Sequence, residues 1–279
     1  MPSPLLPAPE HRAESAFVIP LQDDTPVERT PVVTYALVAV NVLVFLWQVD
    51  VGELGRVYRD AHALLGDAPG ALATAWQYAN DHVASTARRG GMIPFEILAL
   101  RDVDAPDLVP PPFTILTSLF LHAGVGHLAF NMLFLWIFGN NVEDALGRLR
   151  YLFFYLACGT AAALAHVAAS GASGNLLQRA QDLQTPMVGA SGAIAGVLGA
   201  YLLLFPRARI HTLVLFIRVL PLPSRLFLGL WFAGQLLAVV LGEDTGVAFF
   251  AHIGGFVAGL LLAPMIGTRR RWRARRVAF

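Results

Sequence analysis

Six stretches of this chain are long enough and apolar enough to cross a lipid bilayer as helices. A spanning helix needs about 20 mostly apolar residues. The stretches that meet this requirement are residues 31–49, 125–141, 151–170, 186–205, 226–241 and 247–266. Only 14% of the residues are charged, against about 25% in soluble domains. The sequence therefore predicts an all-α membrane protein built as a bundle of six transmembrane helices.

One further apolar stretch, residues 113–121, lies just before the second span. Gly124 and Gly126 separate it from that span, and the whole stretch 113–138 is long for one straight helix. We expect residues 113–121 to be interfacial or re-entrant.

The arginines predict which side of the membrane each loop occupies. All 20 basic residues are arginines, and 14 of them lie in the N-terminal segment, in the loops after the second and fourth spans, and in the C-terminal tail. The positive-inside rule makes that side cytoplasmic. Both termini are therefore expected in the cytoplasm, with a flexible leader (1–30), a membrane domain (31–267) and a basic tail (268–279).

The long first loop, residues 51–122, is expected on the opposite side. Within it, Asp67 can cap a helix that begins at Pro69. Apolar residues then recur at helical spacing, namely Leu72, Trp76, Ala79 and Val83. Two interpretations stay open here: an amphipathic helix on the outer membrane surface, or a small cap packed on the helix bundle.

Several classes of function are excluded by what the chain lacks. The net charge of +1 gives no reason to expect nucleic acid, and the single cysteine, Cys158, rules out an internal disulfide. No span contains an aspartate or glutamate, which excludes an intramembrane aspartyl protease, and no glutamate neighbours an intramembrane histidine as in the HExxH zinc motif. We expect neither a metal ion nor a cofactor.

The polar residues inside the spans are functional candidates, because polarity in hydrocarbon costs free energy. At 1.5 Å per residue, Ser191 would lie roughly 7 Å below the outer face and His252 roughly 12 Å below it. His127 and Asn131 occupy the first two turns of their span. All these helices run from the outside inwards, so the groups share a layer in the outer third of the bilayer.

His127 and Asn131 are four residues apart and therefore share one helix face. Their N–H groups could stabilise an oxyanion, or they could only link helices, a bond worth about 0.6 kcal/mol on average. The remaining histidines (His11, His62, His82, His166 and His211) are expected to be structural or solvated.

Small residues predict that the fourth and sixth spans touch. Gly192, Gly196 and Ala200 on one helix, and Ala251, Gly255 and Gly259 on the other, each recur at a spacing of four, which lets helices approach closely. That contact would bring Ser191 within hydrogen-bond reach of His252. A serine needs such a base to become nucleophilic. Without a buried acid the pair would be a dyad, although packing alone also explains small residues around a serine.

Three motifs in this order resemble the rhomboid family of intramembrane serine proteases. They are HAGVGHLAFN (122–131), GASG (189–192) and AHIGG (251–255), and LWIFGNNVEDALGRLRY (135–151) is similar to a turn of that family. The resemblance implies that Ser191 is the nucleophile and His252 the general base. It also implies an oxyanion hole formed by His127, Asn131 and the Ser191 backbone N–H, supported by His122, Gly189 and Gly192.

The resemblance further implies a hydrolase that cleaves transmembrane substrates near the extracytoplasmic face, with residues 226–241 as a movable gate that carries Trp231 and Phe232. The family's Trp-Arg pair in the first loop is absent, since Gln77 follows Trp76.

Two other classes of function stay open: a catalytically silent relative that binds or traffics membrane proteins, and a transporter. The expected partners are transmembrane substrates and the lipid bilayer. The lysine-free, arginine-rich composition suggests a bacterial cytoplasmic membrane, and the oligomeric state is not predicted.

Overall fold

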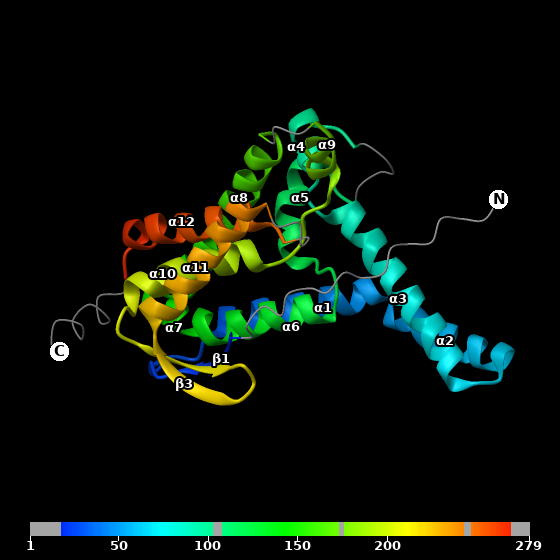
Figure 1. The fold of residues 1–279 in the computed structure, drawn as a ribbon, viewed down its shortest axis with the longest axis horizontal. Helices are drawn as coiled ribbons and strands as arrows, with labels where there is room; N and C mark the ends of the chain where they lie inside the picture. The colour runs from blue at the N-terminus through cyan, green and yellow to red at the C-terminus, as the bar shows by residue number, and fades with distance from the viewer. Residues whose placement is uncertain (1–17, 103–107, 173–175, 243–246, 269–279) are drawn as a thin grey trace.

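The computed structural model describes residues 18–102, 108–172, 176–242 and 247–268 (Figure 1). The helices in chain order are α1 (Val32–Val49), α2 (Val51–Leu65), α3 (Ala68–Gly90), α4 (Pro94–Ala99), α5 (Pro111–Thr117), the 3-10 turn η1 (Ser118–Phe120), α6 (Val125–Phe134), the π-helical segment η2 (Leu135–Gly139), α7 (Asn140–Leu146), α8 (Arg148–Ser170), α9 (Leu176–Gln184), α10 (Ser191–Leu204), α11 (Ser224–Leu241) and α12 (Phe249–Ile266). The strands are β1 (Val18–Asp23), β2 (Arg209–Val214) and β3 (Arg218–Pro223).

The long apolar helices make the chain an integral membrane protein. Among the described residues, four helices are long and apolar enough to span a membrane: Val32–Leu65 (α1 continued by α2), α8, α11 and α12. The pair Pro111–Phe120 and Val125–Leu146 also passes when taken together, and the shorter helix α10 is apolar. The count of six spans and the side of the termini stay predictions.

A bend separates the segment that was expected to be interfacial or re-entrant from the second span. The helical stretch α5–η1 meets the continuous stretch α6–η2–α7 at 78°, and His122 and Ala123 between them are not helical. Residues 113–121 therefore do not continue the second span as one straight helix, and their interfacial or re-entrant place stays a prediction.

The prediction that the fourth span begins at residue 186 is wrong, because α10 begins at Ser191. Met187 forms an antiparallel bridge with Met92, in which each backbone N–H donates to the other residue's carbonyl at 2.8–3.0 Å. Gly189 then adopts a φ of +124°, and its N–H donates to the Ser118 carbonyl at 2.8 Å. These contacts take the backbone groups that a helix would need, so the helix starts later.

The small-residue faces predicted on the fourth and sixth spans do meet. A Cβ added to Gly255 would lie 2.0 Å from the Gly192 carbonyl oxygen, and one added to Gly259 would lie 2.0 Å from that of Gly196. The backbones of α10 and α12 are thus in direct contact, as their sequences predict. Helix α10 is buried along almost its whole length, and Figure 1 shows it among α8, α11 and α12.

The fold is mostly helical, consistent with the predicted all-α membrane protein, and the chain also forms a three-stranded antiparallel sheet of order β1-β2-β3. β2 is the central strand, which places the prolines of β3 on an edge, where a missing N–H is tolerated. β1 comes from the segment predicted as a flexible leader, residues 1–30, and residues 18–30 of that segment have defined places in the fold. The remainder of the leader and the tail after residue 268 lie outside the described residues.

A buried polar cluster ties β1 to the helices. Asp23 accepts hydrogen bonds from the Asn141 amide at 2.6 Å and from the Tyr201 hydroxyl. Tyr201 belongs to α10 and Asn141 to α7, so the strand is anchored to the end of α10 that lies opposite Ser191.

The first loop forms a two-helix hairpin of α2 and α3. The predicted N-cap is confirmed, since the Asp67 side chain accepts from the Gly70 N–H and α3 begins at Ala68. The predicted apolar residues Ala79 and Val83 belong to the buried face of α3, whereas Leu72 and Trp76 are exposed. Figure 1 shows α2 and the start of α3 projecting beyond the end of α1, away from α8, α10 and α12. The end of α3 packs back on the bundle, where Thr86 accepts a hydrogen bond from Gln48 of α1.

Candidate active site

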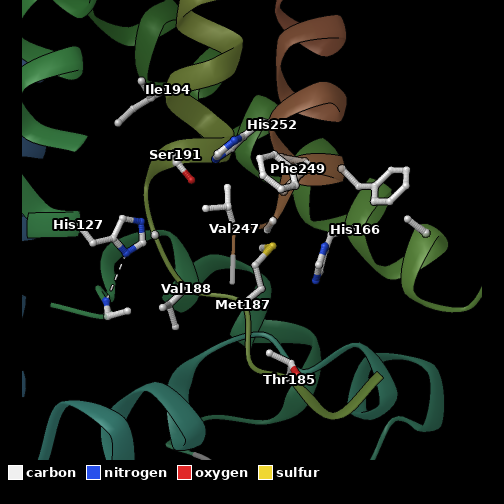
Figure 2. Close-up of a pocket in the computed structure, with 18 of the residues that line it drawn as sticks. His127, His166, Thr185, Met187, Val188, Ser191, Ile194, Val247, Phe249 and His252 are labelled. Carbon is white, nitrogen blue, oxygen red and sulfur yellow. Dashed lines mark hydrogen bonds between the residues drawn. The ribbon is translucent and has the colours of Figure 1, made fainter. Parts of the chain in front are cut away.

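A single cavity collects most of the polar residues predicted to act together. It has a volume of about 1200 Å³ and is lined by residues of α6, α8, α9, α10, α11 and α12. Ser191, His252, His127 and Asn131 all line it, together with Gly189 and Gly192. Figure 2 shows Ser191, His127, His166 and His252 around this space.

Ser191 is the first residue of α10, with Ala190 as the N-cap. The first N–H groups of a helix have no partner within it, and the helix dipole makes this end electropositive. Had the helix started at residue 186, the Ser191 N–H would have been bonded to Met187, whose carbonyl instead accepts from Met92. Because α10 starts late, the Ser191 N–H has no partner within the helix and can donate to a bound anion.

His127 lies directly against the loop that leads to Ser191. A Cβ added to Gly189 would lie 2.8 Å from His127 Nε2, so only glycine permits this approach. The Ala123 N–H donates to His127 Nδ1 at 3.4 Å. With Nδ1 as acceptor, a neutral imidazole carries its hydrogen on Nε2, which faces the loop.

Asn131 lines the cavity next to His127 but also bonds within its own helix. Its Nδ2 donates to the His127 carbonyl at 2.8 Å. An asparagine amide has two N–H groups, so this bond leaves one of them for an oxyanion.

His122 is fully buried behind His127 and is not among the residues that line the cavity. The two rings make an edge contact with their centroids 5.2 Å apart. The His122 backbone N–H donates to Gln48 of α1 at 2.8 Å. His122 thus packs against His127, a member of the oxyanion hole that it is expected to support.

His252 lies on α12 at the level of Ser191. Ala251 and Gly192 are in contact, since a Cβ added to Gly192 would lie 3.8 Å from the Ala251 carbonyl oxygen. The described residues include no hydrogen bond between Ser191 Oγ and His252. The His252 ring instead bonds to Gln235, whose Oε1 lies 2.7 Å from Nδ1. Catalytic hydrogen bonds are often loose until substrate is bound.

The sequence interpretation missed one residue of the site and did not place another in the cavity. Gln235, which bonds to His252, was overlooked, although an amide inside the apolar run 226–241 is a signal by itself. His166 of α8 was predicted to be structural, yet it lines the cavity with Ser191. Spacing alone does not reveal His166, because its position depends on how α8 packs against α12.

The predicted gate helix α11 is seated on α12 in this structure. Phe232 stacks on Phe256 with ring centroids 4.4 Å apart, and Trp231 lies against both Phe256 and His252. Movement of α11 stays a prediction.

Comparison with known proteins agrees with this geometry. Residues 111–269, which contain all three motifs, match the family model of the rhomboid domain. The chain is 34% identical to Rhomboid protein 1, mitochondrial, of Saccharomyces cerevisiae and 32% identical to the Rhomboid protease GluP of Bacillus subtilis, matches that cover 56% and 55% of this chain. It is 30% identical to RHOMBOID-like protein 12, mitochondrial, of Arabidopsis thaliana over 51% of this chain.

The matches cover 42%, 26% and 43% of these three relatives, so the chain spans less than half of each. Two of the three are described as mitochondrial, and the comparisons therefore lend no support to the expected bacterial cytoplasmic membrane. The match to the family model covers more than half of the chain, and it includes every span from the second onwards. The chain belongs to the rhomboid family.

Proposed function

We propose that this protein is an intramembrane serine endopeptidase that cuts transmembrane segments near their extracytoplasmic end. The observation that carries the proposal is the position of Ser191 at the electropositive start of α10, in one cavity with His252, His127 and Asn131. A nucleophile, a base and oxyanion donors are the parts that acyl transfer requires. One relative, from Bacillus subtilis, is described as a rhomboid protease.

In the proposed reaction, Ser191 Oγ attacks the carbonyl carbon of the scissile bond while His252 takes the hydroxyl proton. The negative charge on the carbonyl oxygen is stabilised by the Ser191 backbone N–H, His127 Nε2–H and the second N–H of Asn131. His252 then gives its proton to the leaving amine, and a water molecule, activated by the same imidazole, hydrolyses the acyl-enzyme.

The substrate class follows from the location of the cavity. A transmembrane helix hides its peptide bonds inside its own hydrogen-bonded backbone, so the cut segment must unwind locally and carry small residues. The arginine distribution supports a position of Ser191 towards the extracytoplasmic face, and we propose that cleavage occurs there.

The test is co-expression in a bacterial host with a model single-span substrate of known orientation. We expect wild-type protein to release a fragment whose new end maps to the extracytoplasmic end of the span. Ser191→Ala and His252→Ala should each lower cleavage by roughly a thousandfold or more. Ser85→Ala and His62→Ala are matched controls on the exposed surface of the α2–α3 hairpin and should cleave like wild type.

Two results would contradict the proposal. Full cleavage by Ser191→Ala would show that Ser191 is not the nucleophile. A cut at the cytoplasmic end of the substrate's span would show that the proposed membrane orientation is wrong. A folded wild-type protein that binds substrate without cutting any candidate would instead favour a silent, binding member of the family.

A further inference from the structure

Gln235 of α11 carries the only amide or charged side chain in the apolar stretch 226–241, and it lies against the proposed base. Its Oε1 is 2.7 Å from Nδ1 of His252, a distance typical of a good hydrogen bond. The two residues belong to different helices, so the bond links α11 to α12 at the level of the cavity.

A polar amide inside a membrane helix costs free energy unless it finds a partner. Gln235 is partly buried. Nothing in the packing of α11 on α12 requires an amide at this position, since Trp231 and Phe232 supply the aromatic contacts. The bond to His252 is the feature that accounts for a glutamine here.

The geometry of this bond sets the tautomer of His252. With the amide oxygen facing Nδ1, the hydrogen of a neutral imidazole resides on Nδ1. The other ring nitrogen, Nε2, then carries the lone pair that a general base needs. A histidine with its hydrogen on Nε2 could not accept the serine proton there.

We propose that Gln235 is a positioning residue for the general base. Its Oε1 accepts the Nδ1–H of His252, holds the ring in the tautomer whose Nε2 can take the Ser191 proton, and stabilises the imidazolium formed by that transfer. The role resembles that of the acid in a serine protease triad, with a neutral amide in place of a carboxylate. This inference rests on the proposed protease function.

The first test reads the tautomer and needs no turnover. The full chain is labelled with ¹⁵N-histidine in lipid nanodiscs, and the His252 signals are assigned by their absence in His252→Gln. Wild type should show a protonated Nδ1 and an unprotonated Nε2. Gln235→Met, which keeps the length of the side chain but lacks the acceptor, should shift the population towards the Nε2–H form.

The second test separates positioning from packing by kinetics on the model substrate. Gln235→Met should lower kcat roughly 10- to 100-fold, the range that a hydrogen bond to a charged group supports, with KM within about twofold of wild type. Gln235→Glu should restore kcat to within about threefold of wild type, because a carboxyl group also offers an oxygen acceptor. Leu237→Ala, on the exposed side of the same helix, is the matched control and should leave both constants unchanged.

The outcomes distinguish this inference from the protease proposal. A wild-type chain that shows the Nε2–H tautomer overturns the positioning role whether or not the protein cleaves substrate. An unchanged kcat in Gln235→Met, measured beside an active wild type and an inactive Ser191→Ala, overturns it as well. Loss of activity in both Gln235→Met and Gln235→Glu with the tautomer unaltered would assign Gln235 a packing role and also contradict the inference.

Discussion

Ser191 shows how a few neighbouring residues decide what one side chain can do. The sequence predicts the serine inside a helix that begins at residue 186, where its N–H would be occupied. The bridge of Met187 to Met92 and the φ of +124° at Gly189 delay the helix to Ser191 itself. The bridge joins residues 92 and 187, far apart in the chain, and a single sequence gives no signal for such pairing.

Most of the candidate site could nevertheless be predicted, because polar groups in apolar spans are few. Ser191, His252, His127 and Asn131 were identified by their depth and lie in one cavity. The partners of these groups could not be predicted. Gln235 reaches His252 only because α11 packs on α12, and His122 lies behind His127 because Gln48 binds its backbone.

Asp23 gives a residue-scale prediction about pH and stability. Burial raises its pKa from an ordinary 3.8 to about 6. The folded protein thus favours the protonated carboxyl of Asp23. The contribution of this group to the free energy of unfolding is complete below about pH 3.8 and is lost as the pH rises through about 6. Acidification from pH 7.5 to 5 should raise the stability of wild type relative to Asp23→Asn by about 1–2 kcal/mol, allowing for solvent access.

The measurement is thermal unfolding of both proteins in the same detergent across that pH range. The asparagine side chain of the variant can still accept from Tyr201, so the variant separates titration from loss of the hydrogen bond. Parallel pH curves for the two proteins would contradict the account of Asp23.

At the scale of elements, the contact of α10 with α12 was predictable and the sheet was not. Small residues at a spacing of four identify two helix faces that can meet, and Gly255 and Gly259 meet α10 as predicted. β1 and β2 are separated by most of the chain and pair only because the helices bring their ends together. Local patterns thus predict helix faces, whereas distant strand pairing depends on the assembled fold.

Gly259→Ala is the element-scale test of this packing. The added Cβ would lie 2.0 Å from the Gly196 carbonyl oxygen and 2.7 Å from its Cα, so the two backbones must move apart. We expect a loss of about 1–3 kcal/mol of stability, seen as a lower unfolding temperature, together with weaker activity because His252 moves with α12.

Gly229→Ala on α11 is the matched control, since its added Cβ would meet nothing within 4 Å. It should be neutral or slightly stabilising, as alanine favours helices over glycine. Equal unfolding temperatures for Gly259→Ala and wild type would show that α10 and α12 do not approach as closely as described.

For the whole molecule, the fold forms a cavity among apolar helices, and the candidate polar residues line it. In the proposed function α10 carries the nucleophile, α12 the base and α6 the oxyanion donors, and residues of all three helices line the cavity of about 1200 Å³. Helix α2 and the start of α3 project away from α8, α10 and α12 (Figure 1), whereas the end of α3 reaches the cavity wall, where Gly91 lies against Val188. The central proposal is therefore that His252 activates Ser191 within this cavity.

Labelling with a fluorophosphonate probe tests that claim most directly, because the probe reacts only with an activated serine. The full-length protein in lipid nanodiscs is treated, digested and mapped by mass spectrometry. We predict one modified peptide, which contains Ser191, with labelling abolished in Ser191→Ala and reduced at least about a hundredfold in His252→Ala. A folded wild-type protein that stays unlabelled, or labelling that persists in Ser191→Ala, would contradict the account.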